Sequence, residues 1–467
     1  MVSFVGLCLL LGAGHLLRVH IRLFRKLYLP SCVVAGLLGL VIIQALAAMD
    51  GLGPSIHRVN IALSDWTGLW KDLPGFLVNI VFACLFLGVT PPKLSSLWRR
   101  AAPQVAYGQI IAWGQYVVGL GLWVLVLGRL FPQFPAMFGG VLEVGFEGGH
   151  GTAAGMGPVF EYHGWPEGLQ FALASATFGI MSAIIVGMTL INWAVRAGWV
   201  QNRIDPSQVA EDDSIGVIPV DRRISAGKLT VSSDIVETFS LHIVIVGIAV
   251  GIGYLMKQFL LLVEKSIPYL FEHKFLSSFP LFPLCMLGGL FVQLFMERFD
   301  KHQVIDLGLT RRIQNASLDF LVVAAVATIK LQIVLKGLVP LLVLVAAGIA
   351  WNVFCLLLLA PRFLPDAWFQ RAIAELGQSM GVTATGLLLL RVVDPDYETP
   401  AADAFACKQL VHEPFMGGGL WTSTAIPLIA IAGAPPVLLI ATVVLGLWFF
   451  VVLYFRPGFA KAGRNNR

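Results

Sequence analysis

Residues 148–155 read Gly-Gly-His-Gly-Thr-Ala-Ala-Gly and interrupt a sequence that is otherwise strongly apolar. A second stretch, residues 379–386, reads Ser-Met-Gly-Val-Thr-Ala-Thr-Gly and shows the same mixture of glycine and hydroxyl side chains. Glycine interrupts helices because it takes backbone conformations that other residues avoid. The same order of residue types follows each stretch, at Pro166, Phe171 and Ala172 and at Pro400, Phe405 and Ala406. The two stretches therefore look like copies of one element.

The composition places the chain in a lipid bilayer. Its residues are 57% hydrophobic and 13% charged, and its mean hydropathy is +0.81, whereas soluble proteins carry about 25% charged residues. A helix of about 20 apolar residues crosses the hydrocarbon core. Eleven stretches approach that length: residues 2–17, 29–48, 73–89, 105–130, 168–193, 238–262, 279–296, 318–336, 338–360, 403–430 and 435–455. The sequence predicts an all-α polytopic membrane protein.

A polar stretch, residues 196–237, divides these spans into two groups. We expect it to be a cytoplasmic linker between an N-terminal repeat, residues 1–195, and a C-terminal repeat, residues 238–432. Five full spans precede the linker, and because five is odd, the second repeat begins on the opposite side of the membrane and is inverted. Inverted repeats give two related conformations, each open to one side, which is typical of secondary transporters. Residues 433–467 form an extra transmembrane helix and a cytoplasmic tail.

Basic residues predict the orientation. The first apolar stretch has no basic residue before it and four after it: Arg18, Arg22, Arg25 and Lys26. Lys and Arg collect in cytoplasmic loops, so we expect the N-terminus outside and, after the last span, the C-terminus inside. The same rule accounts for the net charge of +5, and no nucleic-acid partner is implied.

The two glycine-rich stretches lie in segments, residues 135–160 and 372–392, that glycine breaks too often for spanning helices. Re-entrant hairpins fit these segments, because irregular backbone at membrane depth must be buried in protein or line a wet cavity. We therefore expect the two hairpins to face each other at the centre of the fold. The alternative is that their small residues only allow close helix packing.

The hairpins offer ligands for two kinds of solute. The N-terminus of a half-helix presents free N–H groups and the positive end of a dipole, which suit a carboxylate. Unwound carbonyls and threonine hydroxyls are oxygen ligands that suit a small cation, and Thr152 and Thr383 are the candidates for this role. The candidate substrate-binding residues are Gly149, His150, Gly151, Thr152, Gly381, Thr383 and Thr385.

The run Gly148–Thr152, followed by Ala-Thr-Phe-Gly at residues 176–179, resembles the bacterial sodium/glutamate symporters. Pro30, Gln115, Lys330 and the spacing of Gly381, Thr383 and Thr385 extend the resemblance. The resemblance implies two inverted five-helix repeats with paired hairpins, and sodium-coupled symport of glutamate or a related small carboxylate. It also implies a homodimer in the bacterial cytoplasmic (inner) membrane, with sodium as coupling ion and no other cofactor.

Several charged residues depart from the pattern of that family. Glu143 and Glu147 precede the first glycine-rich stretch, and the span 403–430 adds Lys408, His412 and Glu413. In the second hairpin, Ala384 replaces a proline, and Leu389 and Arg391 replace an amide-bearing stretch. Charges inside a membrane are expensive and mark functional sites by default. Glu147, Lys408 and Glu413 are therefore candidates for ion binding or coupling, and pairing of Glu143 or Glu147 with Lys408 or Arg391 is the structural alternative.

Other functions stay open at this point. Proton coupling could use Glu147, Glu413 or His150, since burial changes the proton affinity of such groups. A channel is a further alternative, although it has little need of two equivalent breaks in an inverted repeat. The chain has neither the HExxH nor the GxSxG pattern of hydrolases, so we do not expect an enzyme.

Overall fold

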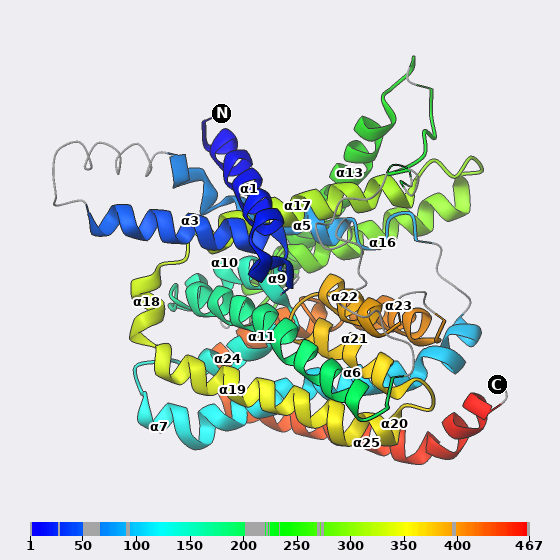
Figure 1. Cartoon of the computed structure of the whole chain (residues 1–467). Helices are drawn as coiled ribbons and strands as arrows, with labels where there is room; N and C mark the ends of the chain where they lie inside the picture. Colours follow the sequence, from blue (N-terminus) through cyan, green and yellow to red (C-terminus); the bar gives the residue numbers. More distant parts are fainter. Residues whose placement is uncertain are drawn as a thin grey trace. The chain divides into compact units, whose positions relative to one another are not determined.

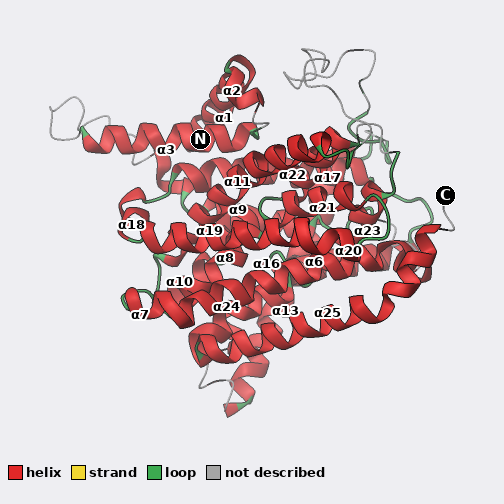
Figure 2. Cartoon of the chain, turned by 60° about the horizontal axis from the view of Figure 1, so that its bottom comes forward, coloured by secondary structure: helices red, strands yellow, loops and turns green. Residues whose placement is uncertain are grey.

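The computed structural model describes residues 2–26, 29–49, 66–89, 94–200, 220, 223, 225–232, 234–268, 271, 275–394 and 398–464. These residues form helices joined by loops, with no strand among them (Figure 2). Eight of the helices are long and apolar enough to cross a membrane. The prediction of an all-α polytopic membrane protein is therefore confirmed. Most of the expected linker (residues 201–219) and the end of the tail (residues 465–467) lie outside the described residues.

Three of the eleven expected spans are wrong as continuous helices. In place of 73–89, α5 (Leu73–Ala83) ends early, and in place of 318–336, α17 (Leu307–Ala327) and α18 (Leu331–Lys336) follow one another with a break. The span 403–430 is two helices, α23 (Ala401–His412) and α24 (Leu420–Ala432).

The break between α23 and α24 has a physical cause in the sequence. Pro414 has no N–H to continue the helix, and Gly417 and Gly418 have positive φ angles of 65° and 106°, which glycine adopts without the steric cost of a side chain.

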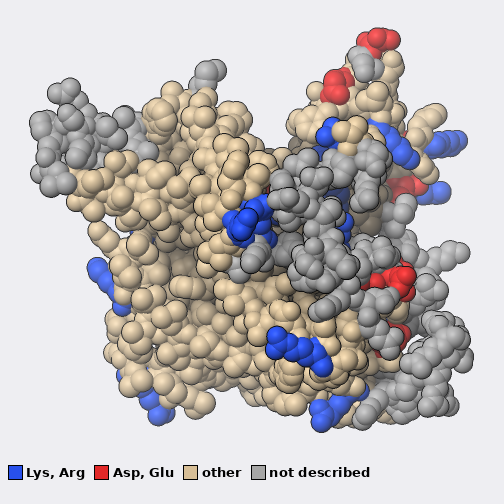
Figure 3. Space-filling model, viewed as in Figure 1, with Lys and Arg blue, Asp and Glu red and all other residues tan. Residues whose placement is uncertain are grey.

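The described surface is largely apolar. On the face drawn in Figure 3, residues other than Lys, Arg, Asp and Glu cover most of the described area. Helix α13 (Thr238–Ser266) exposes Leu255 and Phe259, and α25 (Ala434–Arg464) exposes Leu447 and Phe450, each by more than half. Large apolar side chains at such exposure suit contact with lipid tails.

The chain forms two compact units that interleave along the sequence. Unit 1 comprises Met1–Thr90, Ala154–Tyr162 and Glu211–Leu331, and unit 2 comprises Pro91–Ala153, His163–Ala210 and Gln332–Arg467. Each unit thus takes segments from both sides of the stretch 196–237.

Unit 1 contains six principal helices, three from each side of that stretch: α1 (Val2–His20), α3 (Ser31–Ala48), α5, α13, α16 (Phe282–Phe299) and α17. Helix α1 packs on α3, α3 on α17, α17 on α5, α5 on α16, and α16 on α13. Glycines set several of these contacts. A Cβ at Gly36 would lie 2.6 Å from Val326 Cβ, and one at Gly289 would lie 2.1 Å from the Ala83 carbonyl oxygen.

Unit 2 is built around α6 (Leu94–Leu122), which packs against α19 (Leu338–Phe354), α23 and α25. In Figure 1, α6, α19 and α25 run roughly alongside one another. A Cβ at Gly114 would lie 2.0 Å from the Trp351 ring, and Trp351 Nε1 donates to the Ile111 carbonyl oxygen at 3.0 Å. The close approach of α6 and α19 therefore depends on a glycine. Helix α11 (Gly168–Arg196) packs on the first glycine-rich segment through α8 (Val141–Phe146).

Both glycine-rich segments are broken helices. The first consists of η4 (Ala136–Gly140), α8, α9 (Gly149–Gly155) and α10 (Gly157–Tyr162), of which α10 belongs to unit 1. The second consists of α21 (Trp368–Ser379) and α22 (Thr383–Val393), which pack against each other as a hairpin.

The two interruptions lie against each other, as predicted. Gly149 has a φ of 65°, and a Cβ at this position would lie 3.1 Å from the Val382 side chain and 3.2 Å from the Gly381 carbonyl oxygen. A side chain at the first break would therefore make unusually tight contacts with the second.

Candidate functional site

Two carboxylates lie at the end of α8, directly before the first break. Glu143 and Glu147 are four residues apart, so their side chains share one face of the helix. Both are buried, with exposures of 0% and 4%. Glu143 accepts hydrogen bonds from the hydroxyls of Tyr116 and Thr422, each at 2.7 Å, so both of its oxygens are satisfied by neutral donors.

Glu147 is satisfied at only one of its oxygens. Its Oε1 accepts from Gln378 Nε2 at 2.9 Å and from His412 Nε2 at 2.7 Å. Its Oε2 is buried and has no hydrogen-bond partner among the described residues. Because buried polar atoms nearly always have a partner, this oxygen is the strongest candidate in the described part of unit 2 for a ligand atom of a bound ion.

The proton on His412 can be placed from its neighbours. Trp113 Nε1 donates to Gln109 Oε1 at 2.9 Å, so the Gln109 amide turns its NH₂ group toward His412 Nδ1, 3.1 Å away. An indole N–H can only donate, so this orientation is fixed. His412 Nδ1 must accept, and its Nε2 carries the proton that it donates to Glu147. The contact is a hydrogen bond between a neutral imidazole and a carboxylate.

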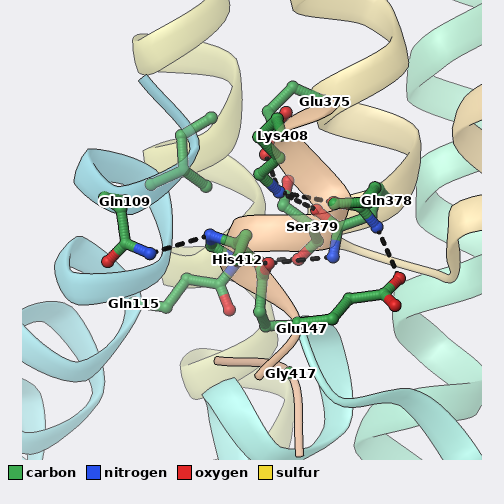
Figure 4. A network of polar contacts seen from close by, with 12 residues as sticks. Gln109, Gln115, Glu147, Glu375, Gln378, Ser379, Lys408, His412 and Gly417 are labelled. Atoms are coloured by element: carbon green, nitrogen blue, oxygen red, sulfur yellow. Dashed lines mark hydrogen bonds and ion pairs between the residues drawn. The ribbon is translucent and has the colours of Figure 1, made fainter. Parts of the chain in front are cut away.

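Lys408 is the centre of the polar network (Figure 4). Its ammonium is fully buried and lies 2.6 Å from Glu375 Oε1. It also donates to Gln378 Oε1 at 3.0 Å and to Gln409 Oε1 at 2.8 Å. Three oxygens thus lie within 3.0 Å of the ammonium, two of them as hydrogen-bond acceptors and one as its ion-pair partner.

Glu375 is held from its other side by α6. Gln104 Nε2 donates to Glu375 Oε2 at 2.9 Å and to the Arg371 carbonyl oxygen at 3.3 Å. The same helix makes room for the ion pair at Gly108, where a Cβ would lie 2.3 Å from Lys408 Cε and 2.6 Å from Glu375 Oε1. The pair therefore occupies space that only glycine leaves open.

Thr383 and Glu413 meet at the start of α22. Thr383 Oγ1 donates to Glu413 Oε1 at 2.9 Å, and Gln409 Nε2 donates to Thr383 Oγ1 at 2.7 Å and to Glu413 Oε1 at 2.9 Å. Two of the sequence-predicted residues are thus in direct contact. They connect to Lys408 through the Gln409 amide.

His150 and Thr152 have other partners. His150 Nε2 lies 3.0 Å from Thr177 Oγ1, and since that hydroxyl donates to the Leu173 carbonyl oxygen, the imidazole nitrogen must be the donor. Thr152 Oγ1 donates to the Gly417 carbonyl oxygen at 3.1 Å. Both side chains fix the first break to its surroundings, and neither is hydrogen bonded to the network around Lys408.

The remaining sequence features fall beside the second break. A Cβ at Gly179, in the Ala-Thr-Phe-Gly run, would lie 2.4 Å from the Met380 carbonyl oxygen. Gln115 Nε2 donates to the Ser379 carbonyl oxygen at 2.7 Å, which satisfies a carbonyl at the end of α21. Thr385 is buried on α22, and a Cβ at Gly381 would lie 3.1 Å from its Oγ1.

The ion pairs considered from the sequence are wrong. Glu147 is bonded to His412 and Gln378, Glu143 to hydroxyls, and Arg391 is exposed. The partner of Lys408 is Glu375, which sequence reasoning missed. Glu375 could have been found, because it is an ionisable residue inside an apolar hairpin segment. The glutamines carried no signal, since an uncharged amide is recognised as a ligand only when its neighbours are known.

A family model described as sodium/glutamate symporter matches residues 1–397 of the chain. The match includes both broken segments and ends before α23, the helix that carries Lys408 and His412. A search of curated proteins and a search of solved structures found no match.

Proposed function

Because the chain belongs to the sodium/glutamate symporter family, which makes it a multi-pass membrane transporter that couples glutamate or a related small carboxylate to sodium, we propose how it does so. Two inverted repeats, residues 1–195 and 238–432, exchange between conformations open to either side of the membrane. The polar network of unit 2 binds the solutes. The unpartnered Oε2 of Glu147 is the observation that carries this assignment.

The packing of unit 1 supports the repeats. Helix α1 packs on α3 as α13 packs on α16, and α3 packs on α17 as α16 packs on α5. Pro30, Cys32 and Gly36 have the same spacing on the first side of the linker as Pro283, Cys285 and Gly289 on the second.

Unit 2 adds a further correspondence. Helix α6 continues into a π-helical turn, η3 (Trp123–Leu127), and α19 into another, η6 (Cys355–Leu359). π-helical turns are rare, so their presence at the same place in two corresponding helices favours two copies of one element.

For the cation we propose Glu147 Oε2 as a ligand, with the Thr152 and Thr383 hydroxyls as further oxygen ligands. Carboxylate and hydroxyl oxygens suit hard cations. Glu413 and Lys408 then act in coupling, because Gln409 joins both of them to Thr383.

For the substrate carboxylate we propose the start of α22, where Gly381, Thr383 and Thr385 cluster and where the first-turn N–H groups and the helix dipole favour an anion. Gly149, His150, Gly151 and Thr152 form the facing wall, since Gly149 lies against Gly381.

Further parts of the proposal concern the whole protein. The N-terminus lies outside and the C-terminus inside the bacterial cytoplasmic membrane, and the protein is a homodimer. It has no catalytic activity and no resident cofactor. Sodium is the coupling ion and is transported with the substrate.

Glu147→Gln and Glu143→Gln test the cation site as a matched pair, because both carboxylates are buried, one on α8 and one at its C-cap, and of the two only Glu147 has an unpartnered oxygen. In proteoliposomes we expect Glu147→Gln to raise the sodium concentration for half-maximal glutamate transport by about tenfold or more, as the loss of a charged ligand costs over ~1.4 kcal/mol. Glu143→Gln should change it less. Equal effects of the two variants would remove Glu147 from the site.

Proton coupling is the second candidate, and the Glu147–His412 hydrogen bond favours it. A neutral imidazole beside a carboxylate can accept a further proton at Nδ1 if Gln109 turns. Glutamate accumulation driven by an inward proton gradient without sodium would support this alternative and contradict sodium coupling.

A further inference from the structure

The surroundings of Lys408 are those of a bound cation. Its ammonium has one carboxylate oxygen and two amide oxygens as partners, from Glu375, Gln378 and Gln409, at 2.6–3.0 Å. Carboxylate and amide oxygens are also the ligands that hard metal cations use in proteins. Lys408 and Glu375 are both fully buried, so bulk water does not compete with the ammonium for these oxygens.

We propose that Lys408 occupies a cation site of this transporter, so that a covalently attached ammonium stands where a monovalent ion from solution would otherwise bind. The proposal rests on the proposed function, because it concerns how many ions the transport cycle requires. The chain then needs one coupling ion fewer than it would with a small side chain at this position.

Surrounding residues hold the ion pair in position, as second-layer residues usually do around ion ligands. Gln104 binds the second oxygen of Glu375, which turns the first oxygen toward Lys408. Gly108 leaves space for the end of the lysine side chain, since any Cβ there would meet Lys408 Cε and Glu375 Oε1. Two positions of α6 that lie one helical turn apart, Gln104 and Gly108, therefore accommodate the ion pair.

The ammonium also determines how its glutamine partners face the transport residues. Because Gln378 Oε1 points to Lys408, its Nε2 points to Glu147 Oε1. In the same way Gln409 turns its Oε1 to Lys408 and its Nε2 to Thr383 and Glu413. A positive charge at this position thus turns the amide N–H donors of both glutamines toward the proposed cation and substrate ligands. A mobile ion bound at the same position would turn the two amides the same way, and Lys408 makes that arrangement permanent.

The site combines two regions of the chain. Glu375 and Gln378 lie within residues 1–397, which the family model matches, whereas Lys408 and Gln409 lie on α23, beyond the match. Two of the three oxygen ligands therefore belong to the matched core, and the charge that they surround comes from the segment beyond it.

A purely structural ion pair is the alternative. A buried pair is often replaced by apolar residues without loss of stability, and its removal creates no ion site. The two accounts differ in what happens when Lys408 alone is removed. A structural pair leaves a damaged protein, whereas an occupied cation site leaves an empty one that a small ion can fill.

The test measures sodium bound per chain in purified full-length protein, with ionic strength held constant by choline chloride. Lys408→Ala is compared with Lys408→Met, which fills the space without a charge, and with Lys408→Ala combined with Glu375→Gln, which removes the charged ligand. We expect Lys408→Ala to bind one sodium ion more than the unmodified chain and to gain thermal stability as sodium rises. The other two variants should bind no additional ion.

Three results would overturn the proposal. Lys408→Ala could bind the same number of ions as the unmodified chain, or no more than Lys408→Met. It could also fail to fold at every sodium concentration while the double variant folds. The outcome is separate from that of the proposed function, because an unmodified chain that binds no sodium would contradict sodium coupling and still allow the additional ion in Lys408→Ala to be counted.

Discussion

Gly108→Ala should destabilise the protein through the buried ion pair. The added Cβ would lie 2.3 Å from Lys408 Cε and 2.6 Å from Glu375 Oε1, so both atoms must move. Neither can move freely, because three oxygens lie within 3.0 Å of the ammonium and both side chains are fully buried. Overpacking alone costs about 1–3 kcal/mol, and disruption of a buried pair about 3–5 kcal/mol. We therefore expect Gly108→Ala to lower the free energy of unfolding by about 1–5 kcal/mol.

Gly121→Ala is the matched control on the same helix. A Cβ at Gly121 has nothing within 4 Å, so the exchange should only improve helix propensity, by about 0.5–1 kcal/mol. Thermal unfolding of the purified protein in one detergent compares the two variants. We also expect Gly108→Ala to cost less when Lys408→Ala is already present, because the clash with Lys408 Cε is then absent and only the contact with Glu375 Oε1 is left. Equal unfolding midpoints for Gly108→Ala and Gly121→Ala, or full additivity with Lys408→Ala, would refute it.

Three further changes test other contacts of the site. Trp113→Phe removes the N–H that orients Gln109, so the His412 proton is no longer fixed at Nε2; imidazole nitrogen NMR should show mixed tautomers, and an unchanged spectrum would contradict the assignment. Gly149→Ala places a side chain at a φ of 65° and should cost about 1–2 kcal/mol in thermal unfolding, with transport lowered; a neutral result would contradict the close approach of the two breaks. Thr383→Val should raise the sodium requirement of glutamate transport several-fold while the unfolding midpoint changes little, and normal sodium dependence would exclude its hydroxyl as a ligand.

Much of the fold follows from the sequence because the bilayer restricts what a spanning segment can be. The long helices α6, α11, α13 and α25 coincide with apolar runs for this reason. The prediction of one continuous span over 403–430 was wrong because its length and apolar content outweighed the helix-ending residues inside it. Pro414 and the glycines at 417–419 are visible in the sequence, and they end one helix before another begins.

The site was predictable only where its backbone geometry requires a particular residue type, such as glycine. Glycines at residues 148–155 and 377–386 predicted both breaks, and their contact was predicted because irregular backbone at membrane depth must be buried in protein or line a wet cavity. The pairing of Lys408 with Glu375 and the orientation of Gln378 depend on which helices are neighbours in space. A local pattern contains no such information, so the network needed the structure.

A sodium gradient drives glutamate through this protein. Proteoliposomes that contain the purified full-length chain, loaded without sodium and placed in sodium chloride with labelled glutamate, measure it most directly. We expect glutamate to accumulate above its external concentration and this accumulation to collapse when sodium is equal on both sides. Equal accumulation with choline in place of sodium, or none under an inward sodium gradient, would contradict it.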